Sequence, residues 1–574
     1  MKKLLIYLKD YKKETILAPL FKMLEASFEL FVPLVIASIV DIGIENGNKG
    51  HILKMGGILL LLGIIGLVCS VTAQYFSAKA ATGFATKLRN ALFAHIQKLS
   101  FSKLDEIGTA TLITRMTSDV NQVQSGVNLV LRLFLRSPFI VIGAMVMAFT
   151  VDVKAALIFV VTIPLLSIVV FGIMLISIPL YKKVQIALDK VLGKTRENLT
   201  GIRVIRAFNK EEEEKQDFYI KNEELNKIQV FVGRFSALMN PVTYLIVNGA
   251  TLYLIWIGAI QVEAGNLEQG EVIALVNYMA QILVELVKLA NLIITVTKAI
   301  ACGNRIEEVL ELKLEEEKEA EELKEEYRNC VAFEDVTFSY HKGANPAIQN
   351  ISFVAKMGET IGIIGGTGSG KSTIVNMLPG FYKATEGKIF IDGKNVNSYE
   401  DSELKDKIGM VMQKAVLFKG SIADNLRFGK EDAKEDEMWQ ALSMAQAEEF
   451  VKEKEGGLNF VINEGGKNLS GGQKQRLTIA RALVKKPQIL VLDDSASALD
   501  YATDACLRKA IKEMGNNQIT FIVSQRTASI MHADKIIVLD EGEMVGIGTH
   551  EQLLKGCQVY KEIYASQFGG EAMA

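Results

Sequence analysis

Apolar residues are concentrated in the first half of the chain, in runs too long for the helices of a soluble core. Residues 55–78, 155–181 and 235–262 contain no charged side chain. Each run is long enough to cross about 30 Å of hydrocarbon as a helix that rises about 1.5 Å per residue. These three runs alone predict three membrane-spanning helices.

Three further segments are apolar but contain a few charges. With them, the pattern predicts an all-α transmembrane domain over residues 15–305, whose six helices cover about 15–42, 52–80, 128–151, 154–181, 234–262 and 271–298. An even number of spans leaves both ends of this domain on one side of the membrane. Residues 1–14 mix lysines with apolar residues, which predicts an interfacial elbow helix lying on the membrane surface.

The distribution of lysine and arginine predicts the orientation of the spans. The connections near 81–127 and 182–233 are rich in these residues, whereas the alternate loops are short and carry few. The positive-inside rule therefore places both termini in the cytoplasm of a multi-pass protein of a bacterial-type cell membrane. The two basic connections are long enough to form helical cytoplasmic extensions.

The second half of the chain has a different composition. A charge-dense segment, 306–329, predicts a solvated linker, and residues 330–574 predict a separate α/β domain. The formal net charge of −2 identifies no charged partner, and we expect no nucleic acid to bind. The five cysteines show no paired spacing, so we expect neither disulfides nor a cysteine-bound metal.

The first chemical motif of this domain is TIGIIGGTGSGKST. A β-rich run leads into Gly-x-x-x-x-Gly-Lys-Ser and then into a helical pattern, which is the strand–loop–helix context of a phosphate-binding loop. Its backbone N–H groups can surround phosphates, while Lys371 reaches the β- and γ-phosphates and Ser372 ligates Mg²⁺. The expected ATP-binding residues of the loop are Gly365, Gly366, Thr367, Gly368, Ser369, Gly370, Lys371, Ser372 and Thr373.

A second anion-binding pattern opens a basic helix twenty residues before the strand ILVLDD. It consists of Leu469, Ser470, Gly471, Gly472 and Gln473. Ser-Gly-Gly at a helix N-terminus can bind a phosphate. One chain acting alone has no evident use for a second such site.

These motifs together resemble those of an ATP-binding-cassette (ABC) exporter half-transporter, over essentially the whole chain. The resemblance implies that two cassettes pack head to tail, so that each ATP lies between one chain's phosphate loop and the other chain's LSGGQ signature. It also implies roles for five further residues: Tyr340 stacks on adenine, Gln413 and Asp493 contact Mg²⁺, and Glu464 and Asp500 mediate coupling between subunits. The middle parts of the two basic connections, near 101–120 and 199–214, resemble the coupling regions of this family.

Two positions depart from the family pattern, and both concern hydrolysis. Asp494 stands where the family has its catalytic glutamate, and Gln525 stands where it has a histidine that contacts the γ-phosphate. The shorter aspartate withdraws its carboxylate by roughly 1 Å, a displacement that can cost on the order of 10²-fold in rate. The resemblance therefore implies the degenerate subunit of a heterodimeric multidrug exporter. Its partner would be a different half-transporter with an intact glutamate and histidine.

The charges within the spans leave the substrate open. Glu29 and Glu285 either line a cavity that favours small cationic amphiphiles or form internal ion pairs, for example between Glu25 or Glu29 and Arg132 or Arg136. The alternatives for the whole protein are a homodimeric exporter of lipid or peptide and an ATP-gated channel or regulator.

Overall fold

The computed structural model describes residues 2–314, 323–341, 343–495, 497–514 and 517–568, so residues 315–322 of the expected linker lie outside the described residues. The chain divides into two compact units. The first comprises Met1–Lys98 and Ile107–Leu312, and the second comprises Leu99–Glu106 and Lys313–Ala574.

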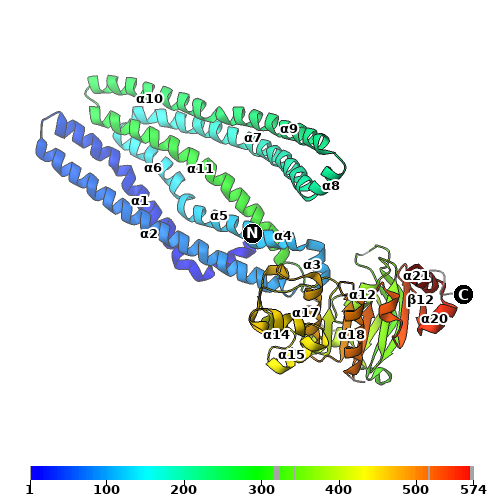
Figure 1. Ribbon diagram of the computed structural model, residues 1–574. Helices are drawn as coiled ribbons and strands as arrows, with labels where there is room; N and C mark the ends of the chain where they lie inside the picture. Colours follow the sequence, from blue (N-terminus) through cyan, green and yellow to red (C-terminus); the bar gives the residue numbers. More distant parts are fainter. Residues whose placement is uncertain (1, 315–322, 342, 496, 515–516, 569–574) are drawn as a thin grey trace. The chain divides into compact units, whose positions relative to one another are not determined.

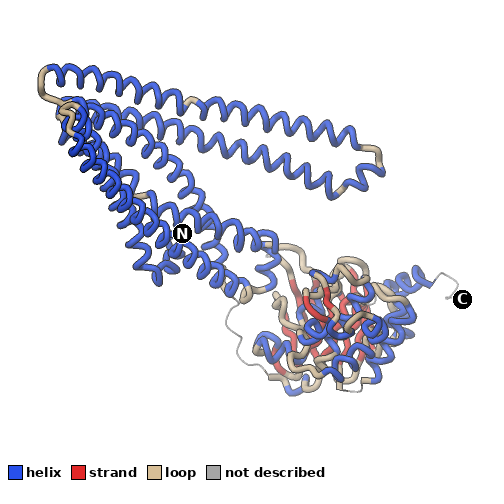
Figure 2. Tube along the Cα trace, turned by 60° about the vertical axis from the view of Figure 1, so that its left-hand side comes forward, coloured by secondary structure: helices blue, strands red, loops and turns tan. Residues whose placement is uncertain are grey.

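The first unit is built from long helices, six of which are apolar enough to cross a membrane (Figures 1 and 2). These helical spans are Lys3–Ile44, Lys49–Ile96, Thr109–Val151, Val153–Thr200, Glu211–Glu263 and Gln269–Leu310. Their elements are η1 (Lys2–Tyr11), α1 (Lys12–Ser38), η2 (Ile39–Ile44), α2 (Lys49–Ile96), α4 (Thr109–Thr114), η3 (Arg115–Asp119), α5 (Val120–Leu133), α6 (Arg136–Val151), α7 (Val153–Thr200), α8 (Ile202–Ala207), α9 (Glu211–Ala237), α10 (Met239–Glu263) and α11 (Gln269–Leu310).

The third span is interrupted between α5 and α6, within the segment 128–151 that the sequence predicted as one helix. Pro138 lies in the first turn of α6 and has no amide hydrogen to donate to the carbonyl four residues earlier, that of Phe134. The regular bonds resume when the amide of Phe139 donates to the carbonyl of Leu135, at 3.2 Å. The break places Arg136 at the first position of α6.

Arg136 joins three of the spans through two ion pairs, of which the one with Glu285 is buried. Its guanidinium donates to Glu285 of α11 and to Glu29 of α1, each at 2.6 Å. The Glu285 carboxylate also accepts bonds from Ser137, at 2.8 Å, and from Lys288, at 2.9 Å. Because Arg136 and Glu285 are both nearly inaccessible, neither charge has water to solvate it if the other is removed.

The second unit contains a six-stranded sheet in the order β12-β11-β3-β10-β9-β6 and a four-stranded antiparallel sheet in the order β2-β1-β4-β5. In the larger sheet all neighbouring strands are parallel except β11 and β12. The strands are β1 (Cys330–Phe338), β2 (Ile348–Lys356), β3 (Thr360–Gly365), β4 (Glu386–Ile391), β5 (Lys394–Asn395), β6 (Ile408–Val411), β7 (Gly420–Ser421), β8 (Val461–Ile462), β9 (Ile489–Asp493), β10 (Ile519–Val523), β11 (Lys535–Asp540) and β12 (Glu543–Gly548).

Helices pack with these strands in two apolar cores. One core lies around β3 and the four-stranded sheet, and the other includes the helical segment between β6 and β9. The helices are α12 (Lys371–Met377), α13 (Asp401–Lys407), α14 (Ile422–Arg427), α15 (Glu435–Met444), α16 (Glu448–Glu453), α17 (Gly471–Leu483), α18 (Tyr501–Glu513), α19 (Thr527–Ile530), α20 (His550–Gly556) and α21 (Gln558–Phe568), with short η4 (Glu325–Tyr327), η5 (Val396–Ser398), η6 (Gly457–Asn459) and η7 (Glu464–Gly466). Within the described residues, the predicted architecture of six apolar helices followed by an α/β domain is confirmed.

Most of the short helix α3 (Phe101–Ile107) belongs to the second unit, although it lies between two spans in the sequence. The ring of Phe101 packs on Phe381, with centroids 4.2 Å apart, and the hydroxyl of Tyr382 donates to Asp105 at 2.6 Å. The other expected coupling region forms α8 in the first unit. Ile202, Val204 and Phe208 in and beside α8 are exposed.

Replacing Arg136 by alanine should destabilise the protein strongly, because the buried Glu285 would keep only Ser137 and the half-exposed Lys288 as partners, and Glu29 would lose its ion pair. Loss of one member of a buried pair costs about 3–5 kcal/mol. Lys227→Ala is the matched control, since it removes an exposed pair with Glu223 that is worth less than about 1 kcal/mol. The measurement is the midpoint of thermal unfolding in detergent. Equal midpoints for the two variants would show that the Arg136 network contributes no more than a surface pair.

Candidate nucleotide-binding site

The candidate site lies at the carboxyl ends of the three central parallel strands. Val523 of β10 is level with Asp493 of β9 and with Ile363 of β3, two residues before Gly365. The loops that follow these strands therefore emerge at one edge of the sheet, where open α/β folds bind their ligands. This register brings together the phosphate loop, the two aspartates and Gln525.

The phosphate loop has the backbone shape that its glycines permit. A side chain at Gly365 would lie 2.1 Å from the carbonyl oxygen of Leu539, so only glycine fits there. Gly370 precedes α12 with a φ of 93°, a conformation that favours glycine. The buried ammonium of Lys371 donates to the carbonyls of Gly365, at 3.0 Å, and Gly366. In this arrangement it holds the loop closed at the point where phosphates would bind.

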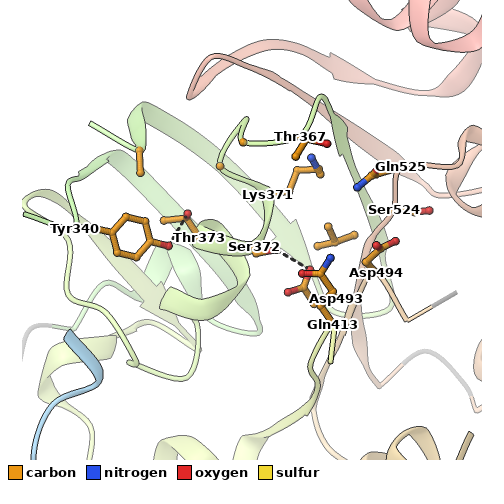
Figure 3. A pocket seen from close by; sticks show the side chains of 14 residues that line it. Tyr340, Thr367, Lys371, Ser372, Thr373, Gln413, Asp493, Asp494, Ser524 and Gln525 are labelled. Atoms are coloured by element: carbon orange, nitrogen blue, oxygen red, sulfur yellow. Dashed lines mark hydrogen bonds between the residues drawn. The ribbon is translucent and has the colours of Figure 1, made fainter. Parts of the chain in front are cut away.

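A pocket of about 280 Å³ opens in front of this loop. Figure 3 shows the side chains around it, which come from the β1–β2 connection, the phosphate loop, the start of α12 and the ends of β6, β9 and β10. The lining residues are Tyr340, Ala347, Thr367, Gly368, Gly370, Lys371, Ser372, Thr373, Gln413, Asp493, Asp494, Val523, Ser524 and Gln525. The structure thus places every predicted residue for stacking, Mg²⁺ contact and hydrolysis around one pocket.

The oxygen donors in this pocket suit a magnesium ion. The hydroxyl of Ser372 donates to a carboxylate oxygen of Asp493 at 3.0 Å, so the two groups already converge. With the amide of Gln413 they offer hard oxygen ligands, the kind that Mg²⁺ prefers while it keeps several waters. In the described part of the chain, no group of three or more histidine, cysteine or acidic side chains could hold a metal. Ser372, Gln413 and Asp493 would hold the Mg²⁺ ion, whose positive charge would offset the negative charge of the ATP phosphates.

The electrostatics of the pocket favour a bound charged ligand. Burial raises the pKa of the Asp493 and Asp494 carboxyls above the ordinary value, and burial lowers the pKa of Lys371. Each shift means that desolvation disfavours the charged form. Phosphates beside Lys371 and a cation beside the aspartates would supply the missing counter-charges.

Asp494 and Gln525 occupy the positions from which hydrolysis would be assisted. The backbone of Asp494 has a φ of 45°, and its amide donates to the carbonyl of Val523 at 3.0 Å. Its carboxylate accepts a hydrogen bond from Gln413. The backbone carbonyl of Gln525 accepts a bond from Gln567 at 2.7 Å, and its side chain faces the pocket (Figure 3).

Tyr340 lies on the opposite side of the pocket from Asp494 and Gln525 (Figure 3). Its hydroxyl makes a 3.0 Å hydrogen bond with Thr373, and its ring meets Phe338 and Tyr382 edge to face. Sequence reasoning missed Tyr382, whose hydroxyl bonds to Asp105 of α3. The adjacent aromatic residues Phe381 and Tyr382, just after the phosphate-loop helix, were the available signal. Tyr382 therefore contacts both Tyr340, the candidate adenine-stacking residue, and Asp105, which lies in a predicted coupling region.

The signature residues do not line this pocket, although they belong to the same unit. Ser470 caps α17, where its hydroxyl accepts a bond from the amide of Gln473 at 3.3 Å. Gly471 has open space around it. Glu464 lies in η7, and Asp500 caps α18 by accepting a bond from the amide of Thr503 at 2.9 Å. Ser470 and Gly471 of the signature are therefore exposed, and the signature does not line the pocket at its own chain's phosphate loop.

Replacing Tyr340 by alanine should weaken ATP binding, because an aromatic ring is lost from the expected adenine wall. Ring stacking is worth about 0.5–1.5 kcal/mol, which corresponds to roughly a 2- to 12-fold rise in Kd. Tyr340→Phe keeps the ring and removes only the hydroxyl that bonds Thr373, so its Kd should stay near that of the wild type. Fluorescence titration with a labelled ATP analogue measures both. An unchanged Kd in the alanine variant would refute the stacking role.

Comparisons with known proteins agree with this architecture. Residues 15–286 match the ABC transporter transmembrane region, and residues 348–497 match the ABC transporter family. The chain is 37% identical to the uncharacterized ABC transporter ATP-binding protein YfiB of Bacillus subtilis, which covers 100% of this chain and 99% of that one. It is 32% identical to the putative multidrug export ATP-binding/permease protein YgaD of B. subtilis, over 99% of both chains.

A further relative and a solved structure are also similar to this chain. The ATP-dependent lipid A-core flippase of Desulfotalea psychrophila is 32% identical over 83% of each chain. The structure of a bacterial Atm1-family ABC exporter with ATP bound has the same fold, with a TM-score of 0.79, 22% identity and coverage of 98% of this chain and 99% of that one. The chain therefore belongs to the ABC transporter family, as an exporter in which one transmembrane domain is fused to one nucleotide-binding domain.

Proposed function

We propose that this chain is one subunit of a heterodimeric, ATP-driven exporter of small amphiphilic or drug-like molecules. It binds ATP and Mg²⁺ at its own phosphate loop, where hydrolysis is impaired, and it supplies an intact LSGGQ to the catalytic site of a different half-transporter. Both termini face the cytoplasm, and the substrate moves outward across the cell membrane. The carrying observation is a complete nucleotide pocket in which only the two hydrolytic positions, Asp494 and Gln525, are altered.

The separation of the signature from its own pocket supports a two-chain assembly. The pocket contains no residue of 469–473, whereas Ser470 and Gly471 are exposed. A second chain that presented its phosphate loop to Ser470 would find a helix N-terminus, which attracts anions. In the same assembly, the signature of the partner would lie against the pocket in front of Lys371 of this chain.

Exposed apolar residues of both units provide further support for a partner. In the first unit, Val204 and Phe208 of the α8 region are 61% and 74% exposed. In the second unit, Val416, Phe418 and Phe428 are also exposed, and the two phenylalanine rings stack with centroids 4.6 Å apart. Docking of α8 from one chain on this aromatic surface of the other would bury both, and would transmit cassette closure to the spans.

The altered hydrolytic residues support asymmetry between the two sites. At Asp494 the carboxylate is one methylene shorter than a glutamate and is already bonded to Gln413. Gln525 can donate a hydrogen bond to a phosphate oxygen but cannot carry a positive charge. A homodimer would have two such sites, whereas a heterodimer needs only one competent site to drive a cycle. The homodimeric alternative, including a lipid exporter, requires that Asp494 itself activates water.

Of the two acidic residues expected to line a substrate cavity, Glu29 is the better candidate for contacting substrate. Glu285 is buried and satisfied by Arg136, Ser137 and Lys288, so it has little capacity to bind cargo. Glu29 is 40% exposed and lines a cleft of about 490 Å³ with Glu25, Ser70, apolar residues of α1 and α2, and Arg136, whose guanidinium donates to Glu29 at 2.6 Å. A cationic amphiphile could place its charge beside Glu29 and its apolar body along this cleft.

Two substitutions separate the heterodimer from the homodimer. Ser470→Ala should reduce the ATPase rate of the assembly by about 10²-fold, because it removes a hydroxyl that would donate a hydrogen bond to the phosphate in the partner's catalytic site. Asp494→Asn alters only the site that is already impaired, and should leave at least half of the rate. The measurement is steady-state ATP hydrolysis by the purified assembly in lipid. If both variants lose activity to the same extent, Asp494 is catalytic and the proposed asymmetry is wrong.

A further inference from the structure

A second cavity of the α/β unit, with a volume of about 400 Å³, lies at the other edge of the large sheet from the nucleotide pocket. It is lined by Thr360, the first residue of β3, and by Thr520, which pairs with Thr360 from the neighbouring strand β10. Both threonines lie at the amino ends of their strands, whereas the phosphate loop and Gln525 follow the carboxyl ends. The two cavities share no lining residue, so the proposed transport cycle gives this one no role.

Two helical segments form the walls of this cavity. Along α18, the lining residues Ala505, Arg508, Lys509 and Lys512 follow the i, i+3, i+4, i+7 spacing of a single helix face. The second wall comes from α19 and from the turn after it, which contributes His532. Because both walls pack on one sheet within one compact unit, the cavity belongs to a single cassette.

The inner and outer parts of the cavity differ in polarity. Ile511 and Ile522 are buried, as is Thr520, and they give the cavity a mainly apolar floor. Lys512 and His532 are exposed. A ligand can therefore place an apolar body against the floor and a charged group beside the exposed basic side chains.

Basic side chains dominate the lining. Within the described residues, no carboxylate lines the cavity, whereas four basic side chains do: Arg508, Lys509, Lys512 and His532. Arg508 pairs with the buried Asp504, at 3.2 Å between its Nε and a carboxylate oxygen. Lys509 lies 4.0 Å from Glu513, in an exposed pair that contributes little. Lys512 and His532 form no ion pair or hydrogen bond with the part of the chain that the structure describes.

Two acids beside the cavity are engaged elsewhere and do not line it. The carboxylate of Asp504 accepts a bond from the hydroxyl of Ser529 at 3.0 Å, in addition to its pair with Arg508. The carboxylate of Asp534 accepts a bond from the amide of Thr360 at 2.8 Å. The ammonium of Lys512 and a ring nitrogen of His532 therefore keep donors for an anion from outside the chain.

Exposed donors above an apolar floor complement a small molecule that joins an anionic group to an apolar body. We propose that this cavity binds a soluble phosphomonoester with an apolar or aromatic body, whose phosphate contacts Lys512 and His532. A phosphate suits the site because its several oxygens accept charge-assisted hydrogen bonds from more than one donor. The volume lies within the range of about 300–1,000 Å³ that is typical of small-molecule sites. Since the cavity belongs to one cassette, the proposal does not depend on whether the partner is a different chain.

Two pairs of matched variants test the cavity. Lys512→Glu reverses a charge of the lining, and Lys555→Glu reverses an exposed lysine of α20 outside the cavity. Ala505→Phe adds a ring at an exposed lining position, and Cys506→Phe adds the same ring at the next residue of α18, which is exposed but does not line the cavity. Retention of the wild-type affinity for ATP shows that each variant is folded.

The measurement is isothermal titration calorimetry of the purified assembly with phenyl phosphate, while Mg²⁺ and a non-hydrolysable ATP analogue saturate the nucleotide pockets. We expect phenyl phosphate to bind at least fivefold more tightly than inorganic phosphate or benzyl alcohol. Lys512→Glu should raise the Kd of phenyl phosphate at least tenfold, and Ala505→Phe should raise it at least fivefold. Lys555→Glu and Cys506→Phe should stay within twofold of the wild type.

Four results would overturn the proposal. If phenyl phosphate does not bind while the nucleotide pockets are filled, or if Lys512→Glu and Ala505→Phe bind it like their controls, the cavity holds no such ligand. If benzyl alcohol binds as tightly, the basic side chains do not recognise the phosphate. If inorganic phosphate binds as tightly, the apolar floor contributes nothing and the ligand class is wrong.

Discussion

The parallel pairing of β3, β10 and β9 is the interaction on which the nucleotide site depends. Parallel strands end on the same edge, so the level register of Asp493, Val523 and Ile363 places three loops within reach of one ligand. The phosphate loop supplies cationic and backbone donors, while the loop after β9 supplies carboxylates. A shift of one residue in either pairing would turn these side chains to the opposite face of the sheet. The sheet therefore fixes the position of the pocket, and the loops supply the residues that line it.

The position of the signature relative to the same sheet supports the proposed assembly of two chains. α17 precedes β9 in sequence, and its signature N-terminus is held by the capping box of Ser470 and Gln473, away from the pocket that β9 helps to form. In the proposed assembly, the signature meets a nucleotide that another cassette brings. When the phosphate loop and the signature belong to different chains, the nucleotide forms part of the interface between subunits. ATP binding can then move one subunit relative to the other.

Much of this arrangement could be predicted from the sequence. Uncharged runs indicated the membrane helices, and the strand–loop–helix context of GGTGSGKS indicated the phosphate site, since both patterns follow from local chemistry. The break before Arg136 was not predicted, because it depends on Pro138 in a segment that is otherwise a plain apolar helix. The bond between Tyr382 and Asp105 joins residues 277 positions apart, and no local pattern encodes such a contact. For the same reason the sequence left two interpretations of Glu285 open, and the structure shows it paired with Arg136.

The central claim is that an impaired site in this chain is complemented by a competent site in another. The most direct test is the composition of the assembly, purified in detergent after the chain is tagged in its native host. The account predicts a second, different ABC half-transporter in equal amount, with glutamate and histidine at the positions of Asp494 and Gln525. An assembly that contains only copies of this chain and hydrolyses ATP would contradict it.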